Sequence, residues 1–191
     1  MELSLENLNK AASTNGVIIG ILSTVIGVVT YYVFPSLLGS MSFGIATLVI
    51  SLLIYVFFTL DLRKKIGGFW TFKEALKGIF LMSFIAGLIY SLANVVFYNF
   101  IEPGAFEKIA GFMESGMSQT FENMGMEQEK IDEAVAKQIE GIKGQYDPTF
   151  AQFFKNLGIA VIIQFVMSLI FAAIFKKETP VFASNTEEEE E

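Results

Sequence analysis

Four long apolar stretches, separated by polar segments, run along the chain over residues 13–34, 43–60, 79–100 and 157–175. None of these stretches contains a charged side chain. A helix rises about 1.5 Å per residue, so about 20 residues span a bilayer core of about 30 Å. The pattern therefore predicts an all-α integral membrane protein with four transmembrane helices.

The polar segment 61–78, DLRKKIGGFWTFKEALKG, sets the expected topology. It holds five of the thirteen Lys and Arg residues, whereas the connector over residues 35–42 holds none. Basic residues beside short membrane loops stay on the cytoplasmic side. We therefore expect residues 1–12, the 61–78 loop and the tail 178–191 to be cytoplasmic, with residues 13–100 forming spans one to three and 153–177 forming span four. The basic residues of the loop are Arg63, Lys64, Lys65, Lys73 and Lys77, and Lys176 and Lys177 end the last span.

Residues 101–152 form an acidic insertion between the third and fourth spans. Ten Asp and Glu residues stand against four Lys in this segment, and Gly125 separates two runs with helical spacing of apolar residues. We expect an extracytoplasmic helical hairpin whose apolar stripes rest on the bundle, on lipid or on a partner protein. Asp147 and Pro148 then predict the N-cap and first turn of the last helix. The tail closes with five glutamates and is expected to be disordered.

Small residues recur on one face of the first span and on one face of the third. Such faces let two helix backbones approach closely. The pattern favours helix packing, with the partner helix lying in this chain or in another copy. The residues are Gly16, Gly20, Ser23 and Gly27 in the first span and Ser83, Gly87 and Ser91 in the third.

Two amides, Asn94 and Gln164, fall inside the third and fourth spans. A polar group in hydrocarbon needs a hydrogen-bond partner. The two spans cross in opposite directions, so both amides are expected at a similar depth and can bond to each other. Because neither side chain carries a charge, a bond between helices is favoured over a substrate site.

The loop between the second and third spans also carries a helix start signal. Thr71 and Glu74 have the spacing of a capping box, which predicts a helix beginning at Phe72. Gly67 and Gly68 precede it as a turn. The neighbouring aromatic residues are expected at the membrane interface.

The amino-acid composition excludes several kinds of catalytic and metal-binding site. The chain of 191 residues has no Cys and no His, which removes thiol nucleophiles, imidazole bases and the commonest zinc ligands. Its net charge is −7 and no basic face exists outside the 61–78 loop, so nucleic acid is not an expected partner. Four methionines of the insertion are favoured as packing residues over a Cu(I) site, and its acidic cluster lacks the spacing of a calcium loop. No catalytic, metal or cofactor-binding residue is predicted.

The chain resembles the bacterial membrane proteins of domain of unknown function 4199. The resemblance covers about residues 8–178, and its motif runs from Gly68 to Gly78, with Phe72, Glu74, Ala75 and Gly78 as recognisable positions. It implies a bacterial inner-membrane protein and carries over no catalytic residue.

Two classes of function compete most directly. The first is a non-enzymatic structural, interaction or accessory protein of the membrane, acting through its spans or its outer hairpin. The second is a small transporter or channel formed by oligomerisation. The four apolar stretches contain no ionisable group of the kind that transport uses in mid-membrane, so the first class is favoured. A membrane enzyme is a third and less favoured reading. The expected partners are the lipid bilayer and another membrane protein or a second copy.

Overall fold

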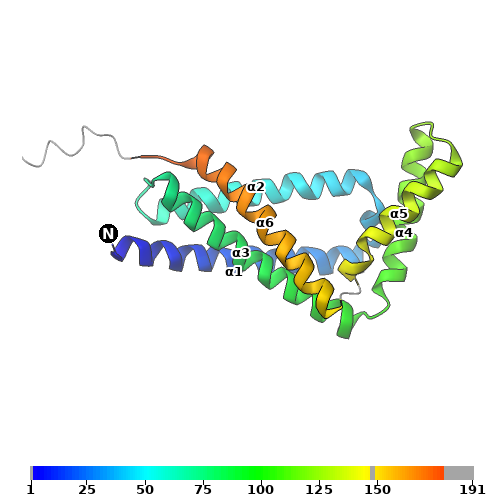
Figure 1. Ribbon diagram of the computed structural model, residues 1–191, viewed down its shortest axis with the longest axis horizontal. Helices are drawn as coiled ribbons and strands as arrows, with labels where there is room; N and C mark the ends of the chain where they lie inside the picture. The colour runs from blue at the N-terminus through cyan, green and yellow to red at the C-terminus, as the bar shows by residue number, and fades with distance from the viewer. Residues whose placement is uncertain (1, 147–148, 179–191) are drawn as a thin grey trace, which may run out of the picture.

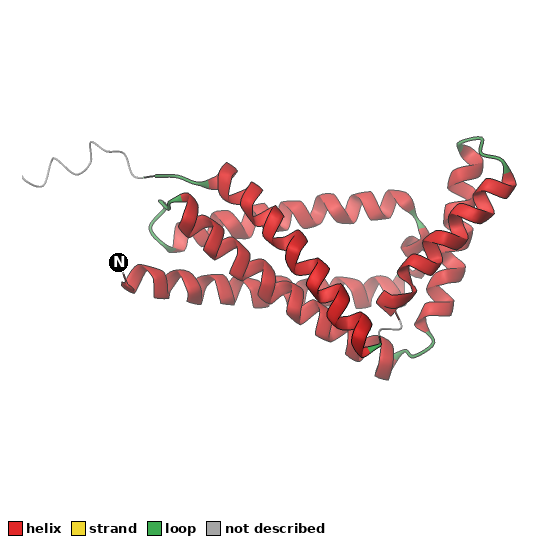
Figure 2. Cartoon of the chain, viewed as in Figure 1, coloured by secondary structure: helices red, strands yellow, loops and turns green. Residues whose placement is uncertain are grey.

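The computed structural model describes residues 2–146 and 149–178, which form six α-helices with one 3₁₀ turn and one π segment (Figures 1 and 2). No strand occurs among these described residues, only one isolated bridge between Trp70 and Lys177. The elements are α1 (Glu2–Val33), η1 (Pro35–Gly39), α2 (Met41–Lys65), α3 (Phe72–Val96), η2 (Phe97–Ile101), α4 (Ala105–Asn123), α5 (Gln128–Tyr146) and α6 (Phe150–Phe175).

Four of these helical segments are long and apolar enough to cross a membrane. They are Glu6–Val33, Met41–Lys65, Phe72–Ile101 and Phe150–Phe175. The predicted all-α class with four spans is therefore confirmed, and the protein is a multi-pass membrane protein.

Helix α1 begins much earlier than the polar N-terminal segment 1–12 suggested. It starts at Glu2, and Leu8 and Ala12 are fully buried. Leu8, Ala12, Asn15 and Ile19 are buried together because they recur every three or four residues on one helix face. The polar composition of the first ten residues hid this stripe.

Helix α2 extends further into the predicted 61–78 loop than the sequence suggested, whereas α3 begins at Phe72 as predicted. Helix α2 continues through Lys65 and α3 begins at Phe72, so only residues 66–71 lie outside helices. Basic side chains in the last turn of a helix interact favourably with its dipole, so the charged run extends α2 instead of ending it. Gly67 and Gly68, with φ of +103° and +87°, then turn the chain. The predicted capping box of Thr71 and Glu74 is present at the start of α3.

Helix α3 is the centre of the bundle. It packs against α1 on one side and α6 on the other, and Figure 1 shows α6 crossing α3 at an angle. Helix α2 is peripheral, since only 6% of its most apolar window is buried compared with 28% for α1. The main core cluster joins α1, the end of α2, α3 and α6, and its largest members are Trp70, Leu8, Leu62, Ile79, Met82 and Phe171.

Helices α4 and α5 form a hairpin that projects from one end of the bundle (Figure 1). Gly125 has φ of +75° and turns the chain between them. A second apolar cluster, made of Tyr31, Phe97, Ala105 and Ile109, joins the base of α4 to α1 and η2.

Helix α6 begins at Phe150, with Thr149 as its N-cap. The Thr149 hydroxyl accepts a hydrogen bond from the backbone N–H of Gln152 at 3.2 Å. The sequence placed the cap two residues earlier. Asp147 and Pro148 lie outside the described residues, as does the acidic tail from residue 179 onward.

Candidate functional site

The glycines of the first span lie against α3 of the same chain. A Cβ added to Gly16 would stand 2.6 Å from the Met82 carbonyl oxygen, and one added to Gly20 would stand 2.8 Å from the Cβ of Ile89. Neither glycine could carry a side chain without moving α3. Ser23 is half-buried, and a Cβ on Gly27 would meet no atom within 4 Å. The close approach therefore covers the first two residues of the predicted face and does not extend to Gly27.

The small residues of α3 face α6. The Ser83 and Ser168 hydroxyl oxygens lie 3.4 Å apart, and the Gln164 side chain fills the space over Gly87. Ser91, one turn further on, lines a cavity between the two helices. The two stripes thus serve different neighbours, since α1 uses glycines to approach α3 and α3 uses small residues to approach α6.

A cavity of about 490 Å³ separates α3 from α6 beyond Gly87; its lining is mixed, and we call it the polar cavity for the polar side chains on it. Asn94 and Gln164 both line it, as the sequence suggested, but they do not bond to each other. The Asn94 amide donates to the Tyr90 carbonyl oxygen of its own helix at 2.8 Å. The Gln164 side-chain oxygen is buried and has no hydrogen-bond partner among the described residues. This cavity is the candidate binding site of the membrane region, and its polar lining is Tyr90, Ser91, Asn94, Tyr98, Asn156 and Gln164.

A second cavity, of about 220 Å³, lies between α2, α3 and α6. It is lined almost entirely by apolar atoms, and Gln164 borders it as well as the polar cavity. The lining includes Leu48 and Tyr55 of α2, Ile79 of α3, and Met167 and Phe171 of α6.

The loop motif builds a junction between α2, α3 and the end of α6. The Trp70 indole N–H donates to the Phe175 carbonyl oxygen at 2.8 Å, and Arg63 donates to the same oxygen at 3.4 Å. The Trp70 and Lys177 backbones exchange two hydrogen bonds of 2.8 and 3.1 Å. These bonds satisfy carbonyl groups that a helix C-terminus leaves without partners.

The other motif residues serve the same junction. Gly68 supplies the turn, and Glu74 closes the capping box by accepting from the Thr71 N–H at 2.8 Å. A Cβ on Gly78 would stand 2.7 Å from a Leu8 methyl carbon, so the lack of a side chain at Gly78 lets α1 pack closely against α3. Phe72 is exposed, and so are Lys64 and Lys65, while Arg63 is half-buried. The structure therefore assigns packing or turn roles to Gly68, Glu74 and Gly78, whereas Phe72 and Lys64 have no described side-chain contact at the junction.

Sequence reasoning missed a polar cluster near the same end of the bundle. Asn15 is fully buried, and its amide nitrogen donates to Asp61 at 2.9 Å. Lys65 donates to the Asn15 side-chain oxygen at 2.9 Å and pairs with Asp61 at 2.6 Å. A lone amide in the first span, together with Asp61 and Lys65 at helical spacing, was the available signal.

A second missed contact lies at the opposite end of α1. The hydroxyls of Tyr31 and Tyr32 donate to the two carboxylate oxygens of Glu102 at 3.1 and 2.8 Å. The bond from Tyr32 is the largest influence on the Glu102 pKa, which is lowered from its ordinary value; the bond from Tyr31 and the charge of Lys108 act in the same direction, and partial desolvation opposes them. Glu102 therefore fixes the exit of the third span against the end of the first.

Comparisons with known proteins address the family. No curated protein and no solved structure matches the chain. A family model described as "Protein of unknown function (DUF4199)" matches residues 14–177, which include most of the first span, the other three spans and the loop motif. The chain therefore belongs to this family of proteins of unknown function.

Proposed function

We propose that this protein is a non-enzymatic accessory subunit of the bacterial inner membrane, which presents the α4–α5 hairpin to a partner protein outside the bilayer. The observation that carries the proposal is the construction of the hairpin, which has an anchored base and an exposed acidic surface. The lysine and arginine distribution supports an orientation with both termini in the cytoplasm and the hairpin on the other side.

The base of the hairpin is held by several independent contacts. Ala105 and Ile109 are buried against Tyr31 and Phe97, and the Lys108 ammonium lies 5.3 Å from the centre of the Tyr31 ring. The Glu102 carboxylate adds its two tyrosine bonds one turn earlier. Such a base fixes the direction in which α4 leaves the bundle.

The two helices also hold each other. Ile131 and Val135 of α5 are buried, and Lys143 lies 5.9 Å from the Phe106 ring centre of α4. Below about 40 residues a chain segment rarely folds alone. The hairpin is of about that size, so its order depends on the bundle that carries it.

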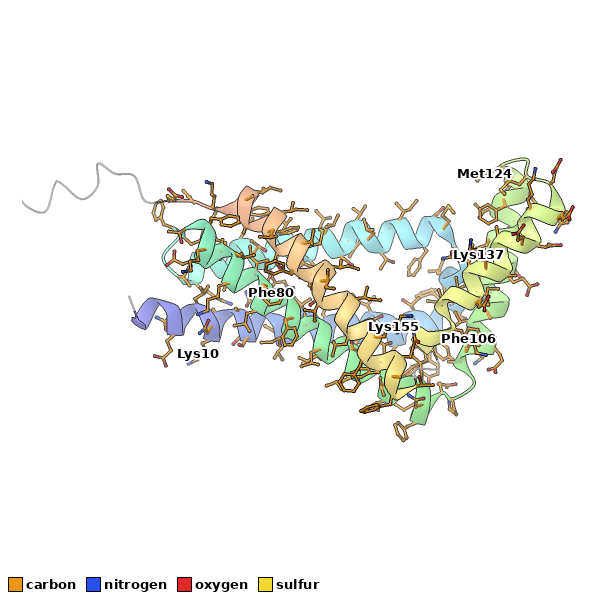
Figure 3. The ribbon with its side chains drawn as sticks, in the orientation of Figure 1. Lys10, Phe80, Phe106, Met124, Lys137 and Lys155 are labelled. Atoms are coloured by element: carbon orange, nitrogen blue, oxygen red, sulfur yellow. The ribbon has the colours of Figure 1, made fainter. Side chains whose placement is uncertain are left out.

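The free surface of the hairpin has a defined chemistry. Exposed Asp and Glu side chains make the surface of α5 acidic, and Met124, which lies at the tip of the hairpin (Figure 3), is 68% exposed. An acidic surface repels anionic headgroups, which favours a protein partner over lipid. A methionine side chain adapts its shape to different apolar contacts. A partner with basic residues around a small apolar patch fits this surface.

The separate positions of two acids that make side-chain hydrogen bonds support a role without catalysis. Asp61 accepts from Asn15 in the first half of α1, whereas Glu102 accepts from Tyr31 and Tyr32 near the end of that helix. General acid–base catalysis needs groups within reach of one substrate. No group of three or more Asp, Glu, His or Cys residues able to hold a metal ion occurs within the described part of the chain.

A small oligomeric transporter is the second candidate, and one observation favours it. The polar cavity between α3 and α6 places the unpaired Gln164 side-chain oxygen inside the membrane region. This reading requires several copies, because four helices around one packed core leave no continuous path.

A site-specific photo-crosslinker separates these candidates in cells that express the full chain. Placed at Met124, it is expected to give a discrete adduct with a different protein. Placed at Leu53, a residue of α2 that is 64% exposed and remote from the hairpin, it serves as the matched control. Glu129→Lys, on the exposed side of α5, should weaken the Met124 adduct. Adducts between copies from both positions would favour the oligomeric transporter, and no adduct from Met124 would refute the accessory role.

A further inference from the structure

The apolar cavity between α2, α3 and α6 opens toward the surface that faces lipid. Two of its lining residues, Leu48 and Ile163, are themselves exposed. Its volume of about 220 Å³ is larger than the roughly 150 Å³ of apolar cavities that stay dry and take up apolar molecules. A cavity of this size and lining is suited to a hydrocarbon group.

The three serine hydroxyls around the cavity already donate to backbone carbonyl oxygens, whereas the Tyr55 hydroxyl and the Gln164 side chain also border it. Ser51 donates to the Thr47 carbonyl oxygen at 2.8 Å, and Ser168 donates to the Gln164 carbonyl oxygen at 2.7 Å. Ser83 donates to the Phe80 carbonyl oxygen at 3.0 Å and lies beside Ser168. These bonds leave the cavity an apolar lining, which favours an acyl chain over a polar solute.

The depth of the cavity below the end of α6 corresponds to one leaflet. Along α6 its lining runs from Ile163 to Phe171, and α6 ends at Phe175. Twelve residues of helix separate Ile163 from Phe175, a rise of about 18 Å at 1.5 Å per residue. Half of a bilayer core is about 15 Å, so the cavity reaches the depth at which an acyl chain ends.

The basic end of the bundle lies about one turn of α6 beyond Phe171, the lining residue nearest to the end of that helix. We define the basic end as Arg63, Lys64, Lys65, Lys73, Lys77, Lys176 and Lys177. Arg63 of α2 reaches across to the Phe175 carbonyl oxygen of α6, and the Phe175 ring lies 5.6 Å from that of Phe171 in the cavity wall. The Phe171 and Phe175 rings therefore lie along α6 between the cavity and the carbonyl group that Arg63 contacts.

Arg63 keeps donors for a further ligand. A guanidinium has five N–H donors, and the one described bond of Arg63 uses one of them. Its exposed neighbours Lys64 and Lys176 add charge. Two acids at this end are engaged, Asp61 with Lys65 and Glu74 with Thr71, whereas Glu178 is exposed.

We propose that the apolar cavity between α2, α3 and α6, a groove open toward lipid, binds one acyl chain of an anionic phospholipid whose phosphate lies on Arg63. Arginine recognises phosphate through paired N–H donors, and the groove accommodates the acyl chain of the same lipid. This lipid site does not include the α4–α5 hairpin, so a negative result for either the lipid site or the accessory role does not bear on the other.

Native mass spectrometry of the delipidated full-length protein in mild detergent tests the site. Phosphatidylglycerol and phosphatidylcholine with identical acyl chains are titrated in turn. The wild-type protein is expected to retain phosphatidylglycerol at least about fivefold more tightly, the factor that about 1 kcal/mol per basic residue gives. Equal retention of the two lipids would overturn the proposal, and this comparison needs no variant.

Two matched pairs of variants locate the site. Arg63→Gln is expected to reduce the preference for phosphatidylglycerol about fivefold. Lys137→Gln, which removes an exposed charge of the hairpin outside the basic end, is expected to change it less than about twofold. Leu52→Phe, which narrows the groove, is expected to weaken both lipids, and Leu53→Phe, one residue outside the lining, to weaken neither. Emission from Trp70, the sole tryptophan, verifies that each variant is folded. Equal effects within either pair would refute the assignment.

Discussion

The contact between α1 and α3 offers the sharpest test of the fold. Gly16→Ala adds one methyl group where the nearest atom is the Met82 carbonyl oxygen at 2.6 Å. That distance is below any relaxed contact, and the obstacle is backbone. The two helices must therefore separate by several tenths of an ångström over the length of their contact. Gly27→Ala is the control, because a Cβ there meets no atom within 4 Å.

The expected magnitude combines two opposing effects. Overpacking of a close interface typically costs about 1–3 kcal/mol. Alanine is favoured over glycine within a helix by about 1 kcal/mol. Gly16→Ala should therefore lower the free energy of unfolding by up to about 2 kcal/mol, whereas Gly27→Ala should raise it by up to about 1 kcal/mol. The two variants should differ by about 1–3 kcal/mol.

Equilibrium unfolding in mixed detergent micelles measures both variants. Trp70 reports the transition, because it is the sole tryptophan and is only 2% exposed in the folded state. Both variants replace a helical glycine by alanine, so the difference between their free energies of unfolding cancels the change in helix propensity. A Gly16→Ala protein as stable as the Gly27→Ala protein would show that α1 does not approach α3 closely, and the arrangement of the bundle would need revision.

Three further predictions concern the ends of the bundle. Trp70→Phe keeps an aromatic ring but removes the donor to the Phe175 carbonyl oxygen, and we expect a loss of about 1 kcal/mol in thermal unfolding followed by circular dichroism; an unchanged midpoint would contradict the junction. The pKa of Glu102 is lowered in the folded protein, so its ionised form adds stability at pH values above the ordinary carboxyl pKa, and this stability is lost as the pH falls through the folded pKa. The thermal unfolding midpoint of the wild-type protein should therefore decline below about pH 4.5, and that of Glu102→Gln should decline less. Parallel curves for the two proteins would refute this linkage. Reporter fusions after Lys65 and after Gly125 should give cytoplasmic and extracytoplasmic signals respectively, and a cytoplasmic signal from the second would reverse the proposed topology.

Local patterns were read correctly where one segment contains the whole signal. Four uncharged stretches predicted four spans because a bilayer core demands an uninterrupted apolar length. The capping box of Thr71 and Glu74 was predicted because both partners lie within one helical turn. The boundaries were less secure, since polar side chains in the first turns of α1 and the last turn of α2 are compatible with helix as well as with loop.

Contacts between segments could be anticipated only as possibilities. The sequence placed Asn94 and Gln164 at similar depth, but rotation about the helix axes decides whether two amides meet, and Asn94 bonds within its own helix. The Asn15–Asp61–Lys65 cluster escaped notice because its members come from two helices whose faces are unknown before packing.

By itself, the sequence determined the number of spans, the positions of the turns and the family motif, because apolar length and local hydrogen bonding are properties of single segments. The tertiary structure decided that α3 is the centre, that Gly16 and Gly20 are in close contact while Gly27 is not, and that a groove remains beside α2. The physical reason is that each helix can turn any face toward its neighbours at little local cost. Only the simultaneous packing of all four spans selects one set of faces.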